Sequence, residues 1–166
     1  MENVFLNLEK EIFRGNVLDI TCDGRGIIYN ANKHYDSFIE IDYLENDLIE
    51  RDTNSGYDSC VMFFSLQNYS TVLRRKQLFK DLHKMLNKNG YLYIWDVNKE
   101  KLKPWNGNIK VSLPDKSIVN LEIKNLNLLE DSTSYKVIDS IKEYFEVIEK
   151  IESNNCFKIV AKRKDD

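Results

Sequence analysis

The chain has 166 residues, of which 42% are hydrophobic and 31% are charged, and its net charge at pH 7 is -3. This composition excludes disordered and fibrous proteins, and the length suits one hydrophobic core, so we expect a single domain over residues 1–166. The slightly acidic balance gives no broad attraction to nucleic-acid phosphates, and no stretch approaches the roughly 20 apolar residues of a membrane helix. We therefore expect neither a nucleic-acid nor a membrane partner.

The cysteines and the amino-terminal segment favour the cytoplasm. Cys22, Cys60 and Cys156 each lie in an apolar run and form no C-x-x-C pair, which predicts buried, reduced thiols. The first residues mix Glu and Lys into the apolar positions, unlike the apolar core of a secretory signal. A cytoplasmic location is the expectation that follows.

The first element is predicted to be a helix. Phe5, Leu8 and Ile12 share one helical face, and Gly15 with the following Asn forms a stop. This spacing predicts a helix over residues 2–14 that ends in a tight turn.

A strand pattern follows that turn. Residues 17–22 are a short apolar run typical of a central parallel strand, and residues 57–65 are a second such run. Between them, residues 26–35 have the pattern of a short helix, and residues 38–43 alternate apolar and acidic residues like a half-exposed strand.

The next helix is the clearest in the chain. Apolar residues recur at helical spacing from Leu78 to Leu86, basic residues such as Arg75 are expected on the exposed side, and Gly90 is the predicted stop. A third apolar strand over residues 91–97 completes a strand, helix, strand unit, which favours a right-handed parallel crossover.

The carboxyl-terminal third is predicted to be rich in antiparallel strands. Residues 108–129 alternate around Pro114 and Asp115, as in a β-hairpin. A helix near Val137 and Ile141 then precedes two alternating strands, over residues 145–151 and 156–162.

Several segments resemble the class I S-adenosylmethionine-dependent methyltransferases. VLDITCDGRG, residues 17–26, is similar to their opening strand and glycine turn, and YDSCVMFFSL, residues 57–66, to their fourth strand. LHKMLNKNGYLYIWD, residues 82–96, resembles a helix, turn and fifth strand, and residues 145–164 resemble the closing antiparallel pair. The resemblance implies an α/β, Rossmann-like methyltransferase fold: a mostly parallel sheet with a carboxyl-terminal antiparallel strand pair, and here an inserted β-hairpin.

The glycine loop departs from the family pattern. That pattern places glycines at alternate positions after the acid, because the cofactor presses against backbone there. Counted from Asp19, those places hold Thr21, Asp23 and Arg25, while the glycines of this chain are one residue out of register.

The middle of the chain is also shorter than the family pattern. Residues 38–43 are therefore either the second strand, which makes Asp42 the ribose-binding acid, or the third, which leaves that acid absent.

The resemblance implies S-adenosylmethionine as the cofactor. Asp19 either orients the loop and the cofactor ammonium or caps backbone N–H groups at the strand end. Asp42 is either the ribose partner or an exposed strand acid, and Ser65 follows the fourth strand together with Leu66 and Gln67. The residues that the resemblance assigns to the cofactor are Asp19, Thr21, Gly24, Gly26, Asp42 and Ser65.

The sequence gives weaker evidence for a functional role of the histidines and of Trp105. His34 has no identifiable partner, and His83, beside Lys84 on the predicted helix, is expected to be a surface residue rather than a base. No His, Cys or carboxylate cluster has the spacing of metal ligands. Trp105 lies in a loop over residues 99–107 where the family often adds a substrate lid. It either stacks on a substrate or packs the hairpin against the sheet.

Two functions remain open at this point. The first is a methyltransferase that acts on a small molecule, with no catalytic residue identified. The second is a non-catalytic binding or regulatory domain that keeps the fold and has lost the cofactor. The oligomeric state does not follow from the sequence.

Overall fold

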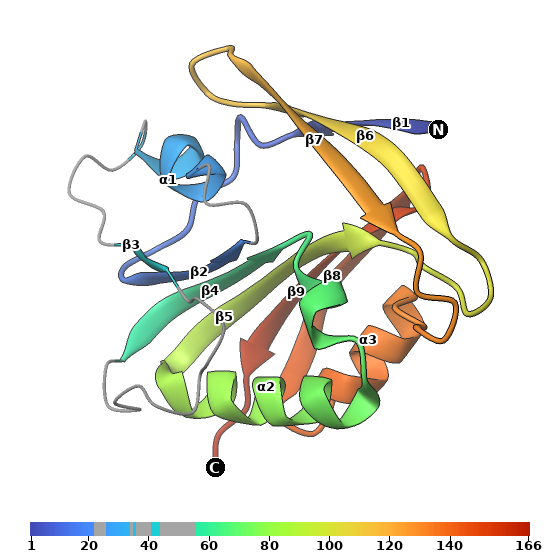
Figure 1. Cartoon of the computed structure of the whole chain (residues 1–166). Coiled ribbons are helices and arrows are strands. Elements are labelled where there is room, and N and C mark those ends of the chain that lie inside the picture. The colour runs from blue at the N-terminus through green and yellow to red at the C-terminus, as the bar shows by residue number, and fades with distance from the viewer. Residues whose placement is uncertain (22–25, 34, 36–40, 44–55) are drawn as a thin grey trace.

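A computed structural model describes residues 1–21, 26–33, 35, 41–43 and 56–166. Within these residues the strands form a six-stranded sheet and a three-stranded sheet (Figure 1). The larger sheet has the order β3 (Ile41–Tyr43), β2 (Val17–Thr21), β4 (Tyr57–Phe63), β5 (Leu86–Val97), β9 (Cys156–Arg163) and β8 (Phe145–Ser153).

The pairing directions confirm the predicted α/β fold. Strands β3, β2, β4 and β5 are parallel to one another, whereas β9 is antiparallel to β5 and β8 to β9. Strand β3 pairs directly with β2, with Leu18 opposite Asp42. Since strand 2 neighbours strand 1 in doubly wound sheets, β3 has the position of the second strand. Residues 38–40 of that predicted strand lie outside the described residues.

Two hydrophobic cores lie on opposite faces of the larger sheet. The helices α2 (Val72–Met85) and α3 (Ser134–Ile141) lie side by side against one face, while the other face carries α1 (Ile27–Asn32) and the smaller sheet (Figure 1). Strand β4 serves both cores, because Cys60 and Met62 belong to the α2 side and Val61 and Phe63 to the other side. This period of two is why β4 reads as a continuous apolar run.

The predicted amino-terminal helix is wrong. Residues Glu2–Asn7 form strand β1, which pairs in parallel with β6 (Trp105–Ser112). Phe5 and Ile12, which would share the apolar face of a helix, are instead 57% and 51% exposed. A single short helix is marginal without tertiary contacts, and the otherwise free edge of β6 offers this segment a ladder of backbone hydrogen bonds along one side.

The predicted hairpin is confirmed. Strand β6 runs antiparallel to β7 (Ile118–Asn125), from Trp105 opposite Asn125 to Ser112 opposite Ile118, and Pro114 and Asp115 lie in the turn. The sequence does not reveal that β1 joins these two strands to make the smaller sheet.

Gly90 does not end the helix before it. Helix α2 ends at Met85, and β5 begins at once with Leu86, which pairs with Tyr57 before an irregularity in the register. The positive φ in this segment belongs to Asn89 (63°), and Gly90 lies within the strand. The strand thus begins earlier than predicted because β4 pairs with it.

Cys60 and Cys156 are buried free thiols, and burial raises the pKa of Cys156 to about 12. Cys22 lies outside the described residues. Among the helices that the structure describes, none has the length and apolar character required to cross a membrane.

The turn before β2 depends on Gly15. Its φ is +67°, and a Cβ built on it would lie 2.0 Å from Asp58 Oδ2, the atom that accepts the Asn16 backbone N–H. We expect Gly15→Ala to lower the free energy of unfolding by about 2 kcal/mol, because the added methyl group displaces Asp58 and strains the backbone. Urea unfolding measures this change, and a loss below about 0.5 kcal/mol would contradict the role given to this turn.

Candidate functional site

The carboxyl ends of the parallel strands form the candidate site. Thr21, the last residue of β2, is paired with Phe63 at the end of β4, and Phe63 is paired with Trp95 near the end of β5. Open α/β sheets bind their ligands outside this edge.

Asp19 is buried in β2, two residues before the strand ends. It is 1% exposed and accepts a hydrogen bond from the Thr21 hydroxyl at Oδ1. Thr21 occupies the first of the places where the family pattern has glycine, so a side chain stands there and interacts with the acid. The strand end is therefore built differently from the glycine turn of the family pattern.

The segment after β4 combines backbone strain with an unsatisfied buried hydroxyl. Phe64 has a φ of 51°, a conformation that bulky residues rarely adopt, and its N–H donates to the Trp95 carbonyl (2.8 Å). Ser65 is 1% exposed, and its Oγ has no hydrogen-bond partner among residues 1–21, 26–33, 35, 41–43 and 56–166. Strained backbone and buried unpaired polar groups both concentrate at functional sites.

Asp96 joins the ends of β4 and β5, and sequence reasoning missed it. It is 5% exposed, and its carboxylate accepts hydrogen bonds from the N–H of Leu66 (2.9 Å) and of Val97 (2.8 Å). Burial raises the pKa of Asp96 to about 6, although the two N–H groups and the Arg75 charge oppose this change. The available signal was a single acid within the apolar run of residues 91–97.

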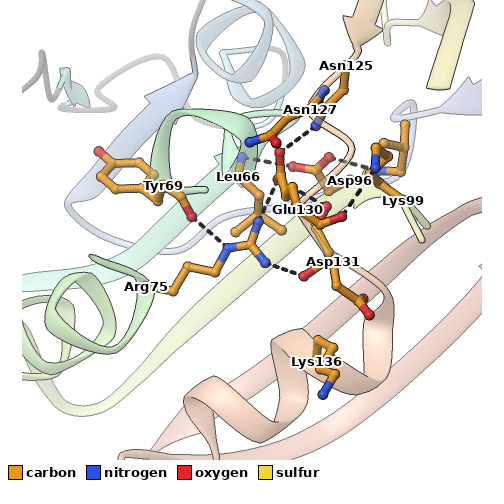
Figure 2. A network of polar contacts seen from close by, with 12 residues as sticks. Leu66, Tyr69, Arg75, Asp96, Lys99, Asn125, Asn127, Glu130, Asp131 and Lys136 are labelled. Atoms are coloured by element: carbon orange, nitrogen blue, oxygen red, sulfur yellow. Dashed lines mark hydrogen bonds and ion pairs between the residues drawn. The ribbon is translucent and has the colours of Figure 1, made fainter. Parts of the chain in front are cut away.

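Arg75 of α2 and Glu130 form a buried ion pair, which Figure 2 shows together with Leu66 and Asp96. Arg75 Nη2 is 2.6 Å from Glu130 Oε1, and the guanidinium also donates to the carbonyls of Tyr69 (2.7 Å) and Asp131 (2.8 Å). Asn125 donates to the second Glu130 oxygen (2.8 Å). Burial lowers the pKa of Arg75, and Glu130 counteracts that effect.

The expectation that Arg75 faces solvent is wrong, because it is 3% exposed. The sequence spacing already indicated that Arg75 is buried. Arg75 lies three, four and seven residues before Leu78, Phe79 and Leu82, which places it on the buried face of α2. The partner Glu130 carried no such signal, because it comes from a distant loop.

The remaining predicted cofactor residues are placed only in part. Gly26 caps α1 with a φ of +64°, and α1 is only six residues long. The backbone of Asp42 lies in β3 beside β2. Gly24 lies outside the described residues.

His83 and Trp105, which the sequence also offered as candidates, do not come together at the carboxyl ends of the parallel strands. His83 lies in the last turn of α2, with Nε2 3.0 Å from the Lys164 carbonyl and its ring against Tyr144. His34 lies outside the described residues. Trp105 is 5% exposed and belongs to the hydrophobic core beneath the hairpin. Of the two roles considered for it, it therefore packs the hairpin against the sheet. Across the described part of the chain, no three His, Cys, Asp or Glu side chains gather as a metal site would require.

Comparison with known proteins identifies the fold. No protein-family model and no curated protein matches the chain. Among solved structures, the PH0226 protein from Pyrococcus horikoshii is 16% identical, with 91% of this chain and 82% of that chain covered and a TM-score of 0.54. The N-methyltransferase NodS from Bradyrhizobium japonicum, in complex with S-adenosylhomocysteine, is 12% identical over 91% and 79% of the two chains, also with a TM-score of 0.54.

A third similar structure is an S-adenosylmethionine-dependent methyltransferase from Clostridium acetobutylicum. It is 10% identical, and the match covers 99% of this chain and 85% of that chain with a TM-score of 0.53. Together with the strand order and pairing directions, these similarities show that the chain has the fold of the class I S-adenosylmethionine-dependent methyltransferases.

Proposed function

We propose that the protein binds S-adenosylmethionine at the carboxyl ends of β2 and β4 and transfers the methyl group to a small molecule. The observation that carries the proposal is Ser65, whose buried hydroxyl lacks a partner among the described residues and directly follows the strained Phe64. A bound ligand with a polar group would satisfy that hydroxyl. The fold and the position at this edge of the sheet support the choice of ligand.

The residues present fit the cofactor in part. The Asp19 carboxylate accepts hydrogen bonds and suits an ammonium group or hydroxyls, and Ser65 can donate or accept. Thr21 is the departure, because its side chain stands where the family pattern leaves backbone exposed. When bound, the cofactor supplies an electrophilic methyl group, and the protein needs chiefly to align the acceptor and exclude water.

Thr21 also supports a second candidate, a binding or regulatory domain that has lost the cofactor. Its hydroxyl already hydrogen-bonds to Asp19, so one carboxylate oxygen is engaged within the protein. The two candidates differ in whether S-adenosylhomocysteine binds, and Thr21→Gly separates them further. If Thr21 alone obstructs the site, the glycine variant will bind S-adenosylhomocysteine more tightly than the natural chain does.

Thermal unfolding with and without millimolar S-adenosylhomocysteine tests the proposal. A ligand at 100 times its dissociation constant adds about 2.7 kcal/mol, which for a chain of this size raises the midpoint by roughly 5 to 10 °C. No rise in either the natural chain or Thr21→Gly would reject cofactor binding and favour the non-catalytic candidate.

Ser65→Ala distinguishes a ligand-binding hydroxyl from a structural one. We expect this variant to be about 1 kcal/mol more stable without ligand, because it removes an unsatisfied buried group, and to show a smaller rise with S-adenosylhomocysteine. Ser59→Ala is the matched control: Ser59 is a buried serine of β4 whose hydroxyl donates to the Arg14 carbonyl (2.9 Å). That control should lose stability and keep the full ligand-induced rise. An unchanged rise in Ser65→Ala would remove Ser65 from the site.

A further inference from the structure

A cavity lies between the amino-terminal part of α2, α3 and the two loops that flank the hairpin. Its volume is about 590 Å³, which is within the range of small-molecule sites. Its lining residues come from residues 70–76, from Lys101, from the loop over residues 127–131 and from α3. None of the described residues that we assign to the cofactor, Asp19, Thr21, Gly26 and Ser65, lines it.

Three lysines give the cavity positive charge. Lys76 comes from α2, Lys101 from the loop after β5 and Lys136 from α3, and all three are exposed. No ion pair involves any of them within the described ranges. Three lysines from separate elements therefore line one cavity, and none of them is held in an ion pair with a described residue.

Two acids, Asp131 and Asp139, also line the cavity, so the three lysines leave an excess of positive charge there. Asp131 accepts hydrogen bonds from the backbone and the hydroxyl of Thr133, and Asp139 is paired with Lys142 outside the cavity. Lys142, followed by the charges of Lys136 and Lys76, lowers the pKa of Asp139, so two of the three cavity lysines act on this acid.

Arg75 forms a fixed part of the wall. Its guanidinium is committed to the carbonyls of Tyr69 and Asp131 and to Glu130, so it is not available to a ligand (Figure 2). The polar head of a ligand would therefore contact the lysines, whose side chains can move to meet it.

Apolar side chains accompany the charge. Val72 and Leu129 line the cavity and are 64% and 79% exposed. Their neighbourhood includes Leu73, 81% exposed, and Leu102, 68% exposed, whose N–H donates to the Leu128 carbonyl and so ties the two loops together. Large apolar side chains gathered at a cavity with this much exposure mark a binding surface.

We propose that this cavity binds a small amphipathic anion, an organic molecule with a carboxylate, sulfonate or phosphate head and an apolar body. The head would lie among Lys76, Lys101 and Lys136, and the body against Val72 and Leu129. This site stands independently of the proposed cofactor, since the two sets of residues do not overlap.

Fluorescence titration with 8-anilinonaphthalene-1-sulfonate, an apolar anion, tests the site, and N-phenyl-1-naphthylamine serves as its uncharged counterpart. In the triple variant Lys76→Gln, Lys101→Gln and Lys136→Gln we expect the affinity for the sulfonate to fall about tenfold, because three charge contacts are lost, and that for the neutral probe to stay the same. Leu129→Ser should weaken both probes. Lys84→Gln is the matched control, since Lys84 is an exposed lysine in the last turn of the same helix.

Saturating S-adenosylhomocysteine in parallel titrations separates this site from the proposed cofactor site. The expected result is that the sulfonate binds equally well in its presence, whatever S-adenosylhomocysteine itself does. The inference is overturned if the sulfonate does not bind, if the triple variant binds it as tightly as Lys84→Gln does, or if S-adenosylhomocysteine displaces it. Because the substituted lysines are exposed, circular dichroism should show the same fold for every variant.

Discussion

Replacing Glu130 with alanine is expected to lower the free energy of unfolding by about 3 to 5 kcal/mol, because it leaves the Arg75 guanidinium buried without its carboxylate. The Arg75 and Glu130 side chains are 4% and 1% exposed, so bulk solvent does not screen the guanidinium. For a chain of this size the midpoint of thermal unfolding should fall by roughly 10 °C or more. Circular dichroism during heating measures the change.

Glu100→Ala is the control for this prediction. Glu100 forms an ion pair with Lys103 at 2.5 Å, but the two side chains are 55% and 71% exposed. Exposed pairs contribute about 1 kcal/mol or less, so this variant should unfold within a few degrees of the natural chain. If Glu130→Ala proved equally mild, the buried pair would not hold the loop before α3 in place.

The second large effect is expected from Asp96, through the pH dependence of stability. Burial raises the pKa of Asp96 from the ordinary 3.8 to about 6, so between these values the folded protein binds more protons than the unfolded chain. The contribution of Asp96 to stability is therefore fully present below about pH 4 and is lost as the pH rises through about 6. A pKa difference of about two units corresponds to roughly 3 kcal/mol.

Comparison with Asp96→Asn isolates this contribution. The variant cannot ionise at this position, whereas every other titrating group remains, including the carboxyl groups of half-buried Glu9 and exposed Asp115, whose pKa values their hydrogen bonds lower. The free energy of unfolding of the natural chain minus that of the variant should fall by roughly 3 kcal/mol between pH 4 and pH 7. Urea unfolding at four pH values gives this difference. A constant difference would mean that Asp96 titrates at the same pH in the folded and unfolded chains.

Asp96 also connects this pH dependence to the candidate site. Its carboxylate holds the N–H of Leu66, the residue that follows Ser65, so protonation alters the group that fixes the segment after β4. The rise in unfolding temperature caused by S-adenosylhomocysteine should then be compared at pH 5 and pH 7. A difference confined to the natural chain, and absent from Asp96→Asn, would identify Asp96 as a positioning residue.

Local patterns in the sequence were enough to predict the central strands and the helix α2. Strands β2 and β4 follow from apolar runs that both faces of a parallel sheet bury, and α2 follows from its apolar stripe. The hairpin and the closing strands follow from alternation around turn residues. The position of Ser65 after β4 likewise follows from the chain order, because a ligand edge lies where parallel strands end.

Tertiary structure decided what local patterns could not. The first residues form β1 because they pair with the edge of β6, about a hundred positions along the chain. The apolar stripe in their sequence favours a helix, but a short helix without tertiary contacts is only marginally stable. β5 begins at Leu86 because β4 pairs with it there, whatever Gly90 favours. Arg75 is buried because Glu130 arrives from the loop before α3 to neutralise it, and a charge inside a protein is stable only when such a partner is present.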